Sequence, residues 1–178
     1  MPATLRFILI YREDGIPIYA KCYTEFCSSL FADTARLTSF LSSLEIMSRK
    51  VSGNQPISSM QMGDIIIKFF KSLPSCHSVV LGLELHNEEL FDALFQAISI
   101  LLEQKYPDKD WSIVDRAFNE EFSNSIVKNA LMPVFHGFDI IHDECELGTA
   151  CPLYIISSLN KKDKPIWMLL KEHAKYSI

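Results

Sequence analysis

The first 23 residues constrain the fold of this chain more than any other segment does. Two runs rich in β-forming residues, 5–11 and 16–23, flank the turn Arg12-Glu13-Asp14-Gly15. An Asp-Gly pair between two such runs is typical of a β-hairpin, because glycine tolerates the positive φ that a tight turn needs. The sequence therefore predicts a chain that opens with a hairpin, and it argues against folds that open with a helix.

The composition is that of a globular protein. The chain has 178 residues, of which 48% are hydrophobic and 22% are charged, enough for one sizeable core plus an extension. The net charge is −5 and the cations are scattered, which argues against nucleic acid as a partner. No apolar run approaches the roughly 20 residues of a membrane span, and a signal peptide is not recognisable. We therefore expect a cytoplasmic protein without a transmembrane segment.

The sequence also predicts the state of the cysteines and the helices and strands that follow the hairpin. Five cysteines form an odd set without framework spacing, so we expect reduced thiols. Apolar residues at helical spacing predict a helix from about Asp33 to Gly53. Short apolar runs at 57–62, 65–70 and 78–85 predict an antiparallel meander. Two further helices are predicted by end signals: Asn87 as a cap and Pro107 as a stop for the second, and a Ser112–Asp115 capping box for the third, which runs to about Leu131.

This order of elements over residues 5–131 resembles the longin domain, a profilin-like module of trafficking and small-GTPase regulatory complexes. The passage from Tyr11 to Tyr19 is similar to the first hairpin of that family, in which an acidic-Gly turn precedes Pro, a hydrophobic residue and Tyr. The passage from Ser58 to Asp64 is similar to the third strand and its turn in archaeal longin-like proteins. The resemblance implies an α/β (α+β) fold: a five-stranded antiparallel sheet with one helix on one face and two on the other.

Residues 132–178 go beyond that pattern. We expect a longin-like domain over 1–131 and a C-terminal extension packed on it, with strands at 135–141 and 153–157 and a short helix at 165–176. The tail is too apolar to be typical of disorder.

Few residues point to chemistry. His136, His142, Cys145 and Cys151 are the types that bind zinc, but only the middle two have the usual ligand spacing. Cys76-His77 is the one adjacent Cys-His pair, and no nucleophile elbow, phosphate loop or dinucleotide motif is present. We therefore predict that the protein is not an enzyme and that it binds neither a metal ion nor a cofactor. Arg36 and Arg49 are the arginines best placed to act on a bound GTPase.

Excess apolar residues on the first helix predict a protein-binding surface. This helix is apolar on more than one side, and the neighbouring run 57–62 has no charged residue to protect it as an edge strand. The same residues could instead be ordinary core. In longin relatives the first helix and third strand bind partners, which implies a surface made by Phe40, Leu44, Ile46, Met47, Ile57, Met60 and Met62.

Two functions follow from this. The first is a non-catalytic protein-interaction module of longin type, which acts in small-GTPase regulation or membrane-trafficking machinery as a homo- or heterodimer and could associate peripherally with membranes through its partners. The alternative is a small-ligand or metal-dependent sensor that uses a profilin-like sheet.

Overall fold

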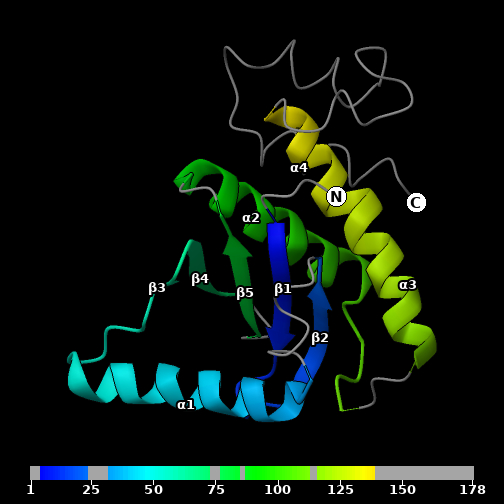
Figure 1. Ribbon diagram of the computed structural model, residues 1–178. Coiled ribbons are helices and arrows are strands. Elements are labelled where there is room, and N and C mark those ends of the chain that lie inside the picture. The colour runs from blue at the N-terminus through cyan, green and yellow to red at the C-terminus, as the bar shows by residue number, and fades with distance from the viewer. Residues whose placement is uncertain (1–4, 24–31, 73–76, 85–86, 113–115, 139–178) are drawn as a thin grey trace. The chain divides into compact units, whose positions relative to one another are not determined.

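Five antiparallel strands form one sheet in the first part of the chain. In the computed structural model, which describes residues 5–23, 32–72, 77–84, 87–112 and 116–138, the strand order is β2-β1-β5-β4-β3 (Figure 1). The strands are β1 (Leu5–Tyr11), β2 (Pro17–Cys22), β3 (Ser59–Met62), β4 (Ile65–Lys71) and β5 (Ser78–Leu83). The predicted hairpin and the predicted antiparallel meander are both confirmed.

The described residues fall into two compact units, which divide between residues 86 and 87. The first unit holds the sheet and helix α1 (Thr34–Val51). The second holds α2 (Glu88–Lys105), α3 (Arg116–Ile126), a π-helical turn η2 (Val127–Leu131) and α4 (Met132–Gly137).

Glycine allows close approach at two places in the first unit. Gly15 lies at φ +83° in the β1–β2 turn, where its N–H donates to the carbonyl of Arg12 at 2.8 Å. Gly82 of β5 lies opposite Phe7 of β1, and a Cβ at Gly82 would come within 2.4 Å of the Phe7 ring. The Phe7 ring therefore occupies the space where a side chain at Gly82 would begin, so a residue larger than glycine would displace it.

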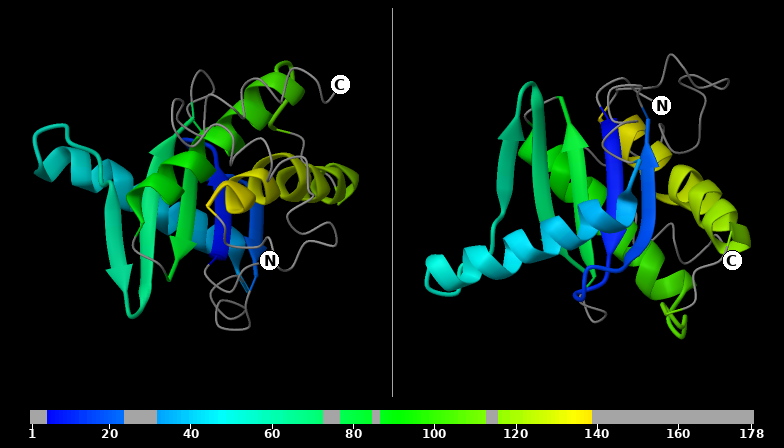
Figure 2. Two further views of the ribbon diagram at one scale, coloured as in Figure 1. Left: turned by 90° about the horizontal axis from the view of Figure 1, so that it is seen from above. Right: turned by 60° about the horizontal axis from the view of Figure 1, so that its bottom comes forward.

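A core cluster joins the sheet to α1. It contains side chains of β1, β4 and β5 together with Leu41 of α1, and Leu37, Ile57 and Met60 pack against it. Its buried members are Phe7, Leu9, Tyr11, Leu41, Ile65, Ile67, Phe69 and Val80. Helix α1 thus covers this face of the sheet, as the right-hand view of Figure 2 shows.

The start of α2 agrees with the sequence, since Asn87 caps it by accepting a hydrogen bond from the N–H of Leu90 at 3.0 Å. The predicted Ser112–Asp115 capping box lies partly outside the described residues. The Ser112 hydroxyl donates to the carboxylate of Asp110 at 2.6 Å, and Asp115 lies outside the described residues. The α2–α3 connection is packed by Tyr106, whose ring meets Trp111, Phe118 and Phe122 edge to face.

The predicted strand at 135–141 is wrong over the part that the structure describes. Residues 135–137 belong to α4, which continues α3 through the π-helical turn, so the third helix runs past Leu131 to Gly137. The wider π-helical turn shifts the helical phase, and the 3.6-residue pattern therefore stops in the sequence where the helix does not. The other predicted elements of the extension lie outside the described residues.

The prediction of reduced cysteines is wrong for Cys22, which is disulfide-bonded. The odd count and poor spacing indicate only that the fold does not depend on a disulfide framework; they do not decide which two sulfur atoms come within bonding distance. The other four cysteines lie outside the described residues.

Candidate protein-binding surface on the first helix

Helix α1 has well-defined ends. Asp33 caps its first turn by accepting a hydrogen bond from the N–H of Arg36 at 3.0 Å. At the other end Ser52 donates its N–H to Ser48, and the chain leaves through Gly53 and Asn54, both at positive φ. The last turns of the helix extend past strand β3, the edge of the sheet (Figure 2). The caps thus fix where the helix begins and ends.

The side of α1 that faces the sheet is mostly polar. Its buried residues are Thr38, Leu41, Ser42 and Glu45, of which only one is apolar. The Ser42 hydroxyl donates to the carbonyl of Glu13 in the hairpin turn at 3.0 Å. Hydrogen bonds as well as apolar packing therefore seat this helix.

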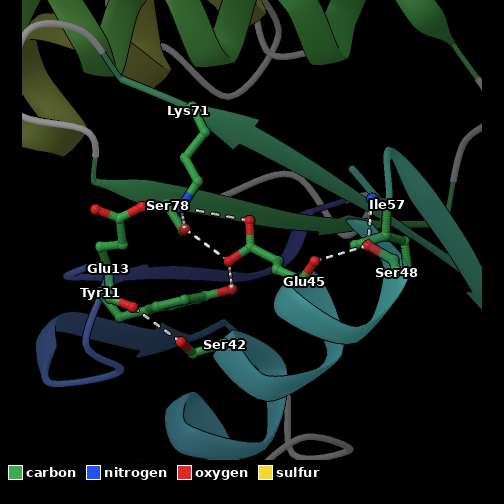
Figure 3. A network of polar contacts seen from close by, with 8 residues as sticks. All are labelled: Tyr11, Glu13, Ser42, Glu45, Ser48, Ile57, Lys71 and Ser78. Atoms are coloured by element: carbon green, nitrogen blue, oxygen red, sulfur yellow. Dashed lines mark hydrogen bonds and ion pairs between the residues drawn. The ribbon is translucent and has the colours of Figure 1, made fainter. Parts of the chain in front are cut away.

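Glu45 is the centre of the polar contacts. Its side chain is 5% exposed, and one carboxylate oxygen accepts hydrogen bonds from the Tyr11 and Ser78 hydroxyls, each at 2.8 Å (Figure 3). Lys71 donates to the Ser78 hydroxyl at 2.5 Å and lies 3.5 Å from the other carboxylate oxygen. We call Tyr11, Glu45, Lys71 and Ser78 the Glu45 network.

The electrostatics of the Glu45 network follow from burial. Desolvation, and after it the negative charge of Glu45, raise the pKa of the Tyr11 phenol well above its ordinary range. Tyr11 therefore stays a hydrogen-bond donor at neutral pH. Because Tyr11 and Ser78 are completely buried, a substrate could not reach them unless α1 moved. The described contacts of this network thus tie one helix to three strands.

A second tie joins the end of α1 to the start of β3. The Ser48 hydroxyl donates to the carbonyl of Glu45 at 2.8 Å and accepts the N–H of Ile57 at 2.9 Å (Figure 3). The exposed side of the helix and the β3 edge are therefore held near each other.

The apolar residues of α1 lie largely on its outer side. Phe40 is 59% exposed, Met47 61% and Val51 85%, while Leu37 and Leu44 are half-buried. These five residues, spaced alternately by three and four, form one line along the helix, which we call the α1 stripe. Exposed apolar side chains in a continuous line are typical of an interaction surface.

Strand β3 extends this apolar character to the sheet edge. Within the described sheet β3 pairs only with β4, so its outer backbone groups have no strand beside them. Its sequence, Ser-Met-Gln-Met, has no charge, and Met62 is 37% exposed. An uncharged edge strand is open to pairing with another chain.

The residues predicted for partner binding divide into two groups. Phe40, Ile46, Met47 and Met62 are exposed, as binding would require. Leu44 is half-buried between them, and Ile57 and Met60 pack against the core cluster. Ile46 lies on the other flank of α1, apart from the α1 stripe, since residues 46 and 47 are about 100° apart around a helix.

The other sequence candidates fall mostly outside the described residues. This holds for His142, Cys145, Cys151 and Cys76, and the side chain of His136 is not described. His77 is 4% exposed, and burial, with the charges of Arg12 and Lys71, lowers its pKa to about 4. Among the described residues no group of three His, Cys, Asp or Glu side chains could hold a metal ion.

Sequence reasoning missed the Glu45 network. The only signal was the spacing of Thr38, Ser42 and Glu45, which places three polar residues on one side of a helix. An i, i+4, i+7 row of this kind normally predicts a solvated side, and here it faces the sheet.

No family model matches the sequence, and no curated protein matches it. In the described residues no helix combines the length and the apolar character needed to cross a membrane.

Proposed function

We propose that this chain is a non-catalytic protein-interaction module of longin type, which acts in small-GTPase regulation or membrane-trafficking machinery. The proposal includes the longin arrangement, with one helix on one face of the sheet and two on the other, and work as a homo- or heterodimer. It also includes a cytoplasmic location, although a disulfide at Cys22 is unusual there. The longin and GTPase parts rest on the resemblance of residues 5–131.

One observation carries the binding role. Helix α1 buries polar residues and leaves Phe40, Met47 and Val51 exposed, beside an uncharged edge strand. Exposure of a large apolar side chain is unfavourable by about 25 cal/mol per Å² of apolar surface that could be buried. A partner that covers the α1 stripe would recover this free energy, and the backbone edge of β3 offers hydrogen bonds alongside.

The test compares two variants of the full chain. Phe40→Ser with Met47→Ser removes the apolar surface of α1, and Ile16→Ser is the control, because Ile16 is 47% exposed in the hairpin turn. Mass in solution is measured by light scattering over a range of concentrations. Capture of purified small GTPases, loaded with GDP or with a GTP analogue, is measured in parallel.

We expect the double variant to lose self-association or GTPase capture while the control keeps both. Intact association and capture in a folded double variant would place the binding surface elsewhere. If the α1 variant changes only self-association and no GTPase is captured in either nucleotide state, the interaction module remains and its link to GTPases is wrong.

A further inference from the structure

The α1 stripe has the spacing of a coiled-coil seam. Steps of three, four, three and four residues separate Leu37, Phe40, Leu44, Met47 and Val51, which is the a/d pattern of a heptad repeat. From the first to the last residue the line is about 21 Å long, at 1.5 Å per residue. A second helix of about four turns would match it in length.

Within Thr34–Val51 the accessible charges are all positive, and the exposed capping residue Asp33 forms an ion pair with Arg36. Over Thr34–Val51 the only acidic residue is Glu45, which is buried in the Glu45 network. Arg36 and Lys50, both exposed, are 14 residues apart with Ser43 midway, so they occupy the g row beside the α1 stripe. The residues of the e row, Leu41 and Ser48, are directed to the sheet side of the helix.

This charge pattern favours a partner helix of opposite charge over a second copy on the α1 stripe. In an antiparallel helix pair g residues face g residues of the other helix, so Arg36 and Lys50 would oppose the same cations. In a parallel pair g faces e, and the e row of the other copy would itself be covered by a sheet. Like charges across a helix pair are unfavourable.

The last 21 residues of this chain are also a poor match in charge. Residues 158–178 contain five lysines, one aspartate and one glutamate, so this segment has the same sign as the exposed side of α1. A lipid bilayer fits less well than a helix does, because interfacial helices bury a broad apolar face, whereas the α1 stripe is a narrow two-position line.

We propose that the α1 stripe binds an acidic amphipathic helix of a partner protein, with apolar residues at heptad spacing and Asp or Glu at the positions that face Arg36 and Lys50. This inference rests on the proposed function and names its partner chemistry. Opposite charges at the flanking positions set partner choice in helix pairs, whereas the apolar seam contributes most of the affinity.

Two synthetic peptides probe the proposal. Both are three-heptad helices with leucine at a and d; one has glutamate at e and g, and the other has lysine there. Like charges at these positions keep each peptide from pairing with itself. Binding to the full chain is measured by fluorescence anisotropy at about 50 mM and about 500 mM salt, since added salt screens exposed charges.

We expect the acidic peptide to bind about tenfold more tightly than the basic one at low salt, with the preference reduced at high salt. The net charge of −5 would favour the basic peptide, so this preference can only come from a local surface. Arg36→Gln with Lys50→Gln should remove most of the preference. The control Lys21→Gln with Arg116→Gln removes two exposed cations elsewhere and should keep it.

Other outcomes would overturn the inference in distinct ways. Equal binding of both peptides, lost in Phe40→Ser with Met47→Ser, would retain the binding surface and reject the charge preference. A preference for the basic peptide, or no binding of either, would reject an acidic helix as the occupant. Co-sedimentation with vesicles of about one-third phosphatidylserine in phosphatidylcholine, without peptide preference, would assign the α1 stripe to a membrane.

Discussion

Helices α1 and α2 have the same length but bury different kinds of side chain. Each has 18 residues, but α2 buries nine, all apolar except Ser99, whereas α1 buries four, of which three are polar. The second helix is thus held by removal of apolar surface from water, and the first depends far more on hydrogen bonds to strands and turns. Apolar residues at helical spacing therefore do not by themselves indicate which side of a helix faces the core.

The largest test of this comparison uses one residue type in both helices. Phe91 of α2 is completely buried, and Phe40 of α1 is 59% exposed. We expect Phe91→Ala to lower the free energy of unfolding by about 3–5 kcal/mol, because it removes a buried ring and leaves a cavity. Phe40→Ala should cost about 0.5 kcal/mol or less. Urea denaturation measures both, and a large loss for Phe40→Ala would show that α1 also depends on apolar burial.

A second test compares the removal of one glutamate from each helix. Glu45 of α1 accepts hydrogen bonds from two buried hydroxyl groups, and Glu103 of α2 is exposed. Glu45→Ala should destabilise the fold by about 2–4 kcal/mol, since Tyr11 and Ser78 lose their acceptor and Lys71 its counter-charge. Glu103→Ala should change stability by at most about 0.5 kcal/mol. Equal small effects, measured by thermal unfolding, would mean that the Glu45 network does not hold α1.

The smallest expected effect concerns the contact between α1 and the hairpin turn. Gly15 and Gly63 both have positive φ, but a Cβ at Gly15 would lie 3.2 Å from the backbone of Ser39, whereas a Cβ at Gly63 meets no atom within 4 Å. Alanine at Gly63 should cost about 1 kcal/mol from backbone strain alone. Alanine at Gly15 should cost more, about 2 kcal/mol, because α1 must also shift. The same cost at both positions would show that α1 is loosely seated.

The hairpin, the meander and two helix starts could be predicted because each depends on local chemistry. Gly15 tolerates positive φ, Asn87 caps a helix, and apolar runs of strand length stand between turns. The third helix could not be followed to its end. In an uninterrupted α-helix Phe135 would lie about half a turn away from Ile126, and the wide turn at Val127–Leu131 reduces this angle, so that both residues are buried.

The candidate surface was predicted in part for a similar reason. Helix α1 has more apolar residues than one buried side can hold, so the sequence could predict that some of them, such as Phe40 and Met47, are exposed. Which side of α1 faces the sheet was not, because it depends on contacts of Glu45 with Tyr11 and Ser78, more than 30 residues away in the sequence. Hydrogen bonds of this range leave no periodic trace in the sequence.

The placement of the Glu45 network has a consequence for how such a chain can diverge. Its contacts lie on the inner side of α1 (Figure 3), while Phe40, Met47 and Val51 are exposed, and we expect these three residues to contribute little to stability. Selection can therefore act on the outer residues almost independently of selection for stability. Descendants of this chain could acquire new binding preferences through a few substitutions on one helix, with the same sheet beneath it.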